Sequence, residues 1–293
     1  MFSPQGPTLR ELTVQALSSV ERGYDLLAPK FDHTPFRTPD RILDATAEAL
    51  RGLGPFASGL DVCCGTGAGL GVLRSLCREQ VTGVDFSAGM LAAAQQTGRA
   101  DETGKADEAD RADDTGKAAA APPGTVAPGT APPATRYVRA DARALPFTDG
   151  FDLAVTFGAL GHFLPGERAA VFAGVHRALR PGGMFAFPVA APPHPRSALY
   201  WTLAGFDAAM RVRNLLWRPP FVMYYRTCPL RDVRADLLAA GFAVGLHPVP
   251  GAARRPDGSP GWRLLVARKE TTRRDDLGPQ NGSRRPQGRP VRY

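Results

Sequence analysis

The stretch that decides the fold is Gly59-Leu60-Asp61-Val62-Cys63-Cys64-Gly65-Thr66-Gly67-Ala68-Gly69-Leu70. Its first half is a short apolar run that suits a buried strand, and Leu70, Leu73 and Leu76 then recur at helical spacing. The glycines between the two parts permit a tight turn that lets the backbone approach a ligand, and the following helix begins with free N–H groups. The stretch therefore predicts a strand, a glycine loop and a helix that bind a nucleotide-like ligand.

A second strand supports this interpretation. The run Val81-Thr82-Gly83-Val84-Asp85 is apolar and ends on an acid that lies 20 residues after Gly65. A carboxylate at that place can accept both hydrogen bonds of a ribose diol. Ser87 then stands where a helix N-cap is expected. Asp85 is therefore the predicted ribose-binding residue.

The remaining order of strands and helices predicts the fold class. Further strands are expected at 136–141, 151–157, 184–189, 242–249 and 261–269, most of them separated by helical patterns. This alternation favours a doubly wound α/β fold with a seven-stranded, mostly parallel sheet. The loop before the last strand is too short for a crossover helix, so the last strand should be antiparallel. Ligands of such sheets bind at the carboxyl ends of the strands.

The chain divides by composition into several parts. Residues 1–37 are expected to form an N-terminal helical lid, and residues 38–269 the main domain. Two insertions are expected within that domain: a disordered, low-complexity segment at 97–134, which is too polar to offset its ordering entropy, and a substrate cap at 191–228. Residues 270–293 are expected to be a disordered basic tail.

Composition narrows the class of protein. The 293 residues carry a formal net charge of +8, but the basic residues are mostly Arg and gather in the tail and the cap, so no nucleic-acid partner is expected. The four cysteines match neither a zinc pattern nor a disulfide framework, so no metal is expected. There is no signal peptide and no apolar run of about 18 residues, and we expect a cytoplasmic protein without a transmembrane segment.

Four segments together resemble a known family. Leu60–Gly67 resembles the first motif of class I S-adenosylmethionine-dependent methyltransferases, Gly83–Leu91 the second and Ala140–Phe147 the third, and Leu179–Gly183 resembles the turn before strand five. They follow the family order over about residues 20–190. The Cys63-Cys64 pair and the entry Tyr24-Asp25 to Phe31-Asp32 are most similar to the ubiquinone/menaquinone C-methyltransferase branch, methyltransferase type 11.

The resemblance implies S-adenosylmethionine as the cofactor and assigns roles in the glycine loop. Asp61 would orient the loop and reach toward the amino group of the cofactor. Gly65 and Gly67 would let the chain pass close to its methionine part, and Asp85 would bind the ribose hydroxyls. Cys63 stands where the family usually has a glycine, which makes its contact with the cofactor less secure.

Other roles follow from the later motifs. Phe86 would pack against adenine, Asp141 would accept a hydrogen bond from the adenine amino group, and the Ala142 N–H would face a ring nitrogen. The segment Thr156–Leu160, with Phe157 among its residues, would line the methyl-donor pocket. Tyr24 would contact the cofactor from the lid.

His162 is the candidate catalytic residue. It follows strand four and should face the methyl acceptor, where a neutral imidazole could take a proton from a hydroxyl or an acidic carbon. The alternative is a partly buried histidine that only hydrogen-bonds to the backbone.

The segment 197–228 has two interpretations. Its apolar and aromatic residues alternate with Arg211, Arg213, Arg218 and Arg226, which suits a lid over a small aromatic or isoprenoid-like acceptor near a membrane surface. The plainer interpretation is an extra helix that packs on the core with its arginines outward.

Three alternatives to a small-molecule methyltransferase stay open. The first is a nicotinamide-dependent oxidoreductase on a similar sheet, although Leu70 stands at the third glycine position of the dinucleotide fingerprint. The others are a non-catalytic S-adenosylmethionine-binding protein and a methyltransferase acting on RNA or protein. The sequence does not name the acceptor, the atom methylated or the oligomeric state.

Overall fold

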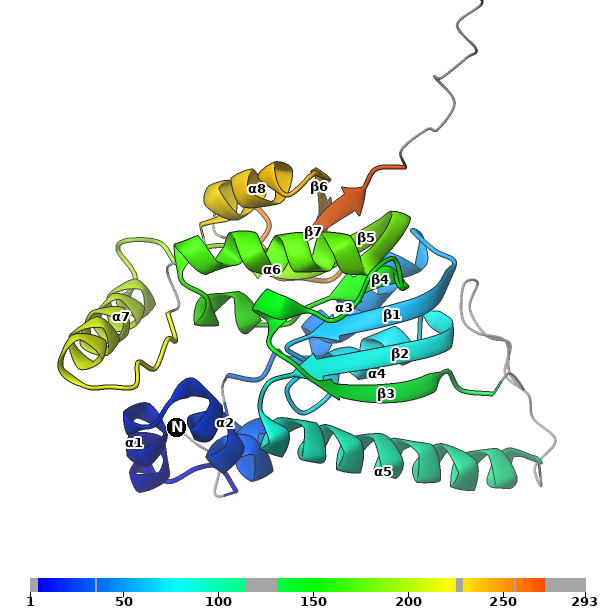
Figure 1. The fold of residues 1–293 in the computed structure, drawn as a ribbon, viewed down its shortest axis with the longest axis horizontal. Helices are drawn as coiled ribbons and strands as arrows, with labels where there is room; N and C mark the ends of the chain where they lie inside the picture. The colour runs from blue at the N-terminus through cyan, green and yellow to red at the C-terminus, as the bar shows by residue number, and fades with distance from the viewer. Residues whose placement is uncertain (1–4, 35, 114–130, 225–228, 256, 272–293) are drawn as a thin grey trace, which may run out of the picture.

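The computed structural model describes residues 5–34, 36–113, 131–224, 229–255 and 257–271, with the side chains of 101–113 left out. Seven strands form one sheet in the order β3-β2-β1-β4-β5-β7-β6 (Figure 1). They are β1 (Phe56–Val62), β2 (Cys77–Asp85), β3 (Ala134–Arg139), β4 (Phe151–Val155), β5 (Leu179–Ala190), β6 (Phe242–Pro248) and β7 (Trp262–Lys269). The first five strands pair in parallel, and β7 is antiparallel to both β5 and β6. The predicted fold class and the antiparallel last strand are confirmed.

Helices cover both faces of the sheet. One face carries α3 (Asp40–Arg51) and α4 (Ala68–Arg74), whose leucines pack with β1, β2 and β4. The other face carries α6 (Pro165–Ala178) and α8 (Leu230–Ala239), which share an apolar core with β4, β5 and β7. Strands that are buried on both faces appear in a sequence as continuous apolar runs. The strands of this sheet could therefore be predicted without an alternation of apolar and polar residues.

Helix α5 (Ala88–Asp113) differs from expectation. It begins after Ser87, whose Oγ accepts a hydrogen bond from Met90 N at 3.1 Å, as an N-cap should. It then continues well into the segment 97–134 that the sequence predicted to be disordered. The Ala, Glu and Lys residues there are good helix formers, and this local propensity explains why the helix continues. Residues 114–130, the rest of the segment, lie outside the described part of the chain.

Two segments lie beyond the helix–sheet layers at the carboxyl ends of the parallel strands (Figure 1). One is the N-terminal segment of α1 (Leu9–Leu17), α2 (Val20–Leu27) and the 3-10 helix η1 (Ala28–His33); the other contains α7 (Ala198–Leu216). Between them lies a third, small apolar cluster, in which Met210, Phe221, Met223 and Tyr224 are buried against Tyr24, Phe36 and Phe206. The expected lid and cap are therefore packed against each other.

Two predicted segments are only partly visible. Residues 225–228 of the cap and residues 272–293 of the tail lie outside the described part of the chain. Within the described ranges, no helix combines the length and the apolar character needed to cross a membrane.

Candidate functional site

The glycine loop joins β1 to α4 through three left-handed backbone positions. The φ angles are +58° at Cys63, +51° at Gly65 and +96° at Gly67, which is also the N-cap residue of α4. A Cβ at Gly65 would meet no atom within 4 Å, so open space adjoins the backbone there. The loop therefore offers the close backbone approach that its glycines predicted.

Cys63 adopts the conformation of the glycine it replaces. A side chain at a left-handed position costs about 1–2 kcal/mol relative to the right-handed region. Burial raises the pKa of the Cys63 thiol, and the negative charges of Asp85, Asp61 and Asp141 raise it further. The thiol is therefore protonated at neutral pH, and three carboxylates lie close enough to the loop to act on it.

Asp85, at the end of β2, holds two loops together. Its Oδ2 accepts a hydrogen bond from Gly65 N at 3.0 Å, and its Oδ1 accepts one from Ser87 N at 2.9 Å. The side chain is buried, and burial raises the pKa of the carboxyl while the N–H groups of Ser87, Gly65 and Phe86 oppose the rise. A carboxylate offers about four lone-pair sites, so acceptor capacity remains for a ribose hydroxyl.

Asp61 lies under the first turn of α4. It is 1% exposed, and neither carboxylate oxygen has a hydrogen-bond partner of good geometry among the described residues. Burial and the charge of Asp85 raise its pKa well above the usual value, and the N–H of Leu70 only moderates the rise. A Cβ on Gly69 would overlap this carboxylate. Asp61 thus supports the loop from beneath α4.

Asp141, which follows β3, is paired with the nearby Arg143. Its carboxylate accepts hydrogen bonds from Arg143 N at 2.9 Å and from the Arg143 guanidinium, which also pairs with Glu167. Arg143 holds the pKa of Asp141 below its usual value. Ala142 is buried beside it, and Phe86, at the end of β2, is half-buried. These three residues follow the carboxyl ends of the neighbouring strands β2 and β3, where an adenine ring was expected.

The segment after β4 completes that edge. Thr156 Oγ1 donates to Val62 O at 2.7 Å and so joins the ends of β4 and β1. Phe157 is half-buried and packs against the core on the α3–α4 face. The 3-10 helix η3 (Ala159–His162) follows and carries His162 toward the lid.

His162 bridges the lid and the cap. Its Nδ1 lies 2.9 Å from Val222 O, and its Nε2 lies 2.9 Å from Tyr24 Oη. A carbonyl oxygen can only accept, so Nδ1 carries the proton. Burial lowers the pKa of His162, and the Val222 carbonyl only opposes this. The ring is therefore neutral at pH 7, and Nε2 accepts from the Tyr24 hydroxyl.

Two aspartates anchor the N-terminal segment to the site loops. Asp25 Oδ1 accepts hydrogen bonds from Ser87 Oγ at 2.6 Å and Gly89 N at 2.9 Å. Asp32 Oδ1 accepts one from Thr66 Oγ1 at 2.7 Å. Sequence reasoning noticed both acids only within a resemblance and gave them no role. Their spacing of seven residues, before the helix that precedes the first strand, was the available signal.

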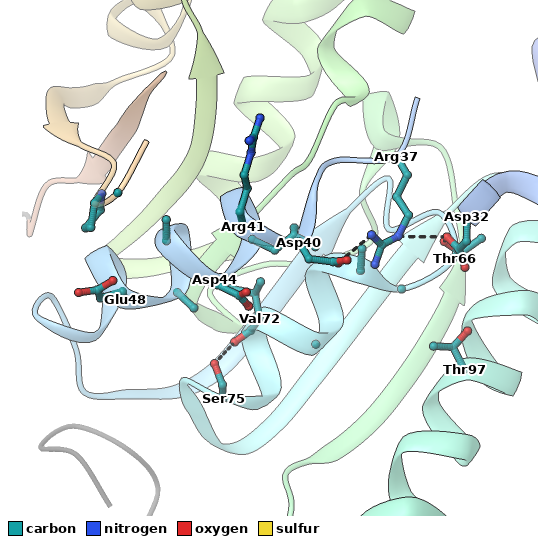
Figure 2. A pocket seen from close by; sticks show the side chains of 18 of the residues that line it. Asp32, Arg37, Asp40, Arg41, Asp44, Glu48, Thr66, Val72, Ser75 and Thr97 are labelled. Carbon is teal, nitrogen blue, oxygen red and sulfur yellow. Dashed lines mark hydrogen bonds and ion pairs between the residues drawn. The ribbon is translucent and has the colours of Figure 1, made fainter. Parts of the chain in front are cut away.

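The structure also has a groove that is not the predicted site. Its volume is about 800 Å³, and it runs between α3 and α4. Its lining includes Asp40, Asp44, Glu48, Arg37 and Arg41, and Arg37 forms ion pairs with Asp32 and Asp40 (Figure 2). The groove touches the glycine loop only at Thr66 and Gly67, and none of the ribose or adenine candidates lines it. The groove therefore does not coincide with the predicted ribose and adenine residues, which lie at the carboxyl ends of β2 and β3. Within the described residues, no cluster of three or more His, Cys, Asp or Glu side chains could hold a metal ion.

Comparison with known proteins agrees with this geometry. A family model of a methyltransferase domain matches residues 60–187, which run from β1 into β5. An uncharacterized methyltransferase of Synechocystis sp. is 46% identical over 55 residues, which are 18% of this chain and 26% of that protein. The match thus spans about a quarter of the length of that relative.

Solved structures share the fold. A putative O-methyltransferase of Nostoc punctiforme is similar with a TM-score of 0.56 at 16% identity, over 87% of this chain and 62% of that one. An S-adenosylmethionine-dependent methyltransferase of Methanosarcina mazei is similar with a TM-score of 0.50 at 19% identity, over 74% and 94% of the two chains. The family match identifies residues 60–187 as a methyltransferase domain, and the chain shares the fold of S-adenosylmethionine-dependent methyltransferases.

Proposed function

We propose that the protein transfers the methyl group of S-adenosylmethionine to a small apolar acceptor. The observation that carries the proposal is the glycine loop, whose backbone is left-handed at Cys63, Gly65 and Gly67, with open space beside Gly65 and with Gly65 N bonded to the Asp85 carboxylate. The cofactor supplies an electrophilic methyl group on a sulfonium cation, next to an ammonium group. A loop of this kind allows the close backbone approach that the methionine part of the cofactor would need.

The sequence of the loop disfavours a dinucleotide. A nicotinamide cofactor places its pyrophosphate at the N-terminus of the first helix, beside a third glycine or alanine of the fingerprint. Here Leu70 stands at that third position. The oxidoreductase alternative is therefore the weaker one.

The acceptor side of the site is apolar. The small cluster between lid and cap brings Phe221, Met223 and Tyr224 against Tyr24, whose ring is stacked with Phe221 at a centroid distance of 6.3 Å. Such side chains suit an aromatic or isoprenoid-like molecule. If these side chains instead fill the acceptor space permanently, the protein would bind S-adenosylmethionine without turnover.

His162 is the proposed base. The acceptor proton would pass to the Tyr24 oxygen as the Tyr24 hydroxyl proton passes to His162 Nε2, while Nδ1–H stays bonded to Val222 O. The enzyme's other work is to align donor and acceptor and to exclude water, which the lid and cap would do. A neutral His162 is a requirement of this step and agrees with its lowered pKa.

Calorimetry tests the cofactor. S-adenosylmethionine, S-adenosylhomocysteine and NADH are titrated into the full chain. We expect micromolar binding of the two sulfur ligands, with the sulfonium form not disfavoured against the neutral thioether. Tighter binding of NADH, or no binding of either sulfur ligand, would refute the proposal.

Release of S-adenosylhomocysteine tests the reaction. Phenols, amines and isoprenoid quinols are offered to the wild type and to Tyr24→Phe and His162→Gln. Loss of the proton acceptor should lower kcat by about 100-fold or more while the affinity for S-adenosylmethionine changes little. Tight cofactor binding without turnover of any acceptor would instead favour the non-catalytic alternative.

A further inference from the structure

Helix α7 has two apolar faces. The inner face packs into the cluster between lid and cap through Met210 and Phe206. On the opposite side, Trp201, Gly205, Ala208, Val212 and Leu215 follow each other at spacings of four, three, four and three, which places them on one face of a helix. We call these five residues, with the adjacent Leu216, the outer face of α7.

The outer face is unusually exposed for its chemistry. Trp201 is 67% exposed, Val212 56%, Leu215 80% and Leu216 76%. Leu199 and Trp217, near the two ends of the helix, are also more than half exposed. Figure 1 shows α7 projecting from one side of the molecule, away from the sheet. Contiguous apolar surface of this kind marks an interaction site rather than ordinary surface.

The charges around the outer face have one sign. Between residues 194 and 220 the sequence contains a single acid, Asp207, and its side chain is buried. Arg196, Arg211 and Arg218 are exposed. The Arg211 guanidinium lies 5.5 Å from the centre of the ring of Tyr224, which belongs to the inner cluster. Two copies of this surface would bring arginines against arginines, whereas a surface of phosphates would complement them.

Hydrogen bonds hold α7 in a fixed position against its neighbouring segments. Asn214 Nδ2 donates to Phe221 O and Tyr224 Oη, each at 3.0 Å, and Phe221 N donates to Asn214 Oδ1 at 2.8 Å. Arg213 Nη2 donates to Ser18 O at 3.0 Å and thereby joins α7 to the end of α1. The outer face is therefore presented in one fixed orientation and needs no refolding to meet a partner.

We propose that the outer face of α7 docks on an anionic lipid surface. The helix would lie in the plane of the interface, with Val212, Leu215 and Leu216 among the upper acyl chains. Trp201 would sit at headgroup level, where indole rings are favoured, and Arg211 and Arg218 would bind lipid phosphates. This docking requires no spanning helix and does not depend on the methyl-transfer proposal.

Vesicle co-sedimentation of the full chain tests the docking. The vesicles are phosphatidylcholine alone or phosphatidylcholine with about one third phosphatidylglycerol. We expect binding to the anionic vesicles and little binding to the neutral ones. Two double variants remove the two kinds of contact: Trp201→Ser with Leu215→Ser, and Arg211→Gln with Arg218→Gln. The arginine pair should weaken binding by about 25-fold, since each basic residue at such a surface contributes about fivefold, and the apolar pair by at least about tenfold.

A matched control removes exposed leucines elsewhere. Leu238→Ser with Leu246→Ser changes side chains that are 44% and 38% exposed on α8 and β6, and this variant should bind anionic vesicles like the wild type. Circular dichroism checks that each variant is folded, and a variant that fails is replaced by its single substitutions. The basic residues of 272–293 are unchanged throughout, so their contribution cancels in the comparison.

Three results would overturn the proposal. The first is no binding of the wild type to anionic vesicles. The second is equal binding by the outer-face variants and the control, which would assign the binding to charge elsewhere. The third is a dimer by light scattering that Leu215→Ser dissolves, which would show that a second copy covers the face.

Discussion

Asp85→Asn separates the two roles that the structure gives to one carboxylate. In the protein alone, Asp85 accepts hydrogen bonds from Gly65 N and Ser87 N. With cofactor bound, the same group would accept a ribose hydroxyl. Asparagine keeps the shape but has one oxygen, and its amide N–H₂ cannot accept a hydrogen bond. The substitution therefore removes part of each role without leaving a cavity.

The two effects have different sizes. One loop N–H loses its acceptor, which costs about 1–3 kcal/mol. Removing a carboxyl whose pKa burial raises offsets part of that loss. The net change in the free energy of unfolding should therefore be within about 2 kcal/mol. On the ligand side, a lost hydrogen bond to a charged group is worth about 1.5–3 kcal/mol, which weakens cofactor binding by about 10- to 150-fold.

Asp152→Asn is the matched control. Asp152 Oδ2 also accepts from two backbone N–H groups, those of Ala57 and Ser58, each at 2.9 Å, but near the amino ends of β1 and β4. Calorimetry with S-adenosylmethionine and S-adenosylhomocysteine, together with urea unfolding, is applied to both variants. We expect comparable losses of stability and a loss of affinity in Asp85→Asn alone, equal for both ligands because both contain the same ribose.

Two results would contradict this reasoning. Unchanged affinity in Asp85→Asn would remove the ribose contact. An equal loss of affinity in Asp152→Asn would show that affinity follows global stability and not the carboxylate at the end of β2.

Three further predictions concern the loop and the pH dependence. Cys63→Gly should change the free energy of unfolding by less than about 1 kcal/mol, because strain relief and chain entropy offset each other, whereas Cys63→Val should lower it by about 2 kcal/mol; urea titration that ranks Gly below Val would contradict the left-handed assignment. Gly69→Ala should lower the thermal midpoint, since its Cβ would overlap Asp61, at about 1–3 kcal/mol; an unchanged midpoint would show that the carboxylate is free to move. Burial raises the pKa of the Asp85 carboxyl, so the contribution of Asp85 to stability is lost as pH rises through that pKa. Hydrogen bonds from Ser58, Arg180 and Ala57 outweigh burial and lower the pKa of Asp152, so the contribution of Asp152 to stability is lost as pH falls through its pKa. Unfolding measured from pH 3 to pH 8 on the two Asn variants should therefore flatten opposite limbs of the stability curve, and identical flattening would be inconsistent with these assignments.

The fold could be predicted because its signals are local. The apolar run to Val62, the glycines after it and the acid that ends β2 define a strand–loop–helix–strand unit within 27 residues, from Gly59 to Asp85. The antiparallel last strand followed from a short loop alone. The length of α5 could not be predicted from core formation, because the repeated residues of its second half are too polar to form a core. Their helix propensity accounts for the helix.

The site could be predicted only in part, because contacts between distant segments leave no local signal. The motifs identified Asp85 and the loop glycines, yet the bond from His162 to the Val222 carbonyl joins residues 60 positions apart and involves a backbone atom. The burial of Asp61 under α4 depends on the space that Gly69 leaves. The pairing of Asp141 with Arg143 could in principle be predicted, since the two residues lie two positions apart.

The position of the long α5 has a practical meaning. The chain leaves α5 at Asp113 and re-enters the sheet at Ala134, the amino end of β3, whereas Asp85, Asp141 and His162 lie after the carboxyl ends of β2, β3 and β4. Additional residues between α5 and β3 are thus separated from these three residues by the full length of a strand. Junctions of this kind accept inserted domains. A fluorescent reporter placed between Asp113 and Ala131 would label this protein in living cells with its cofactor and acceptor sites untouched.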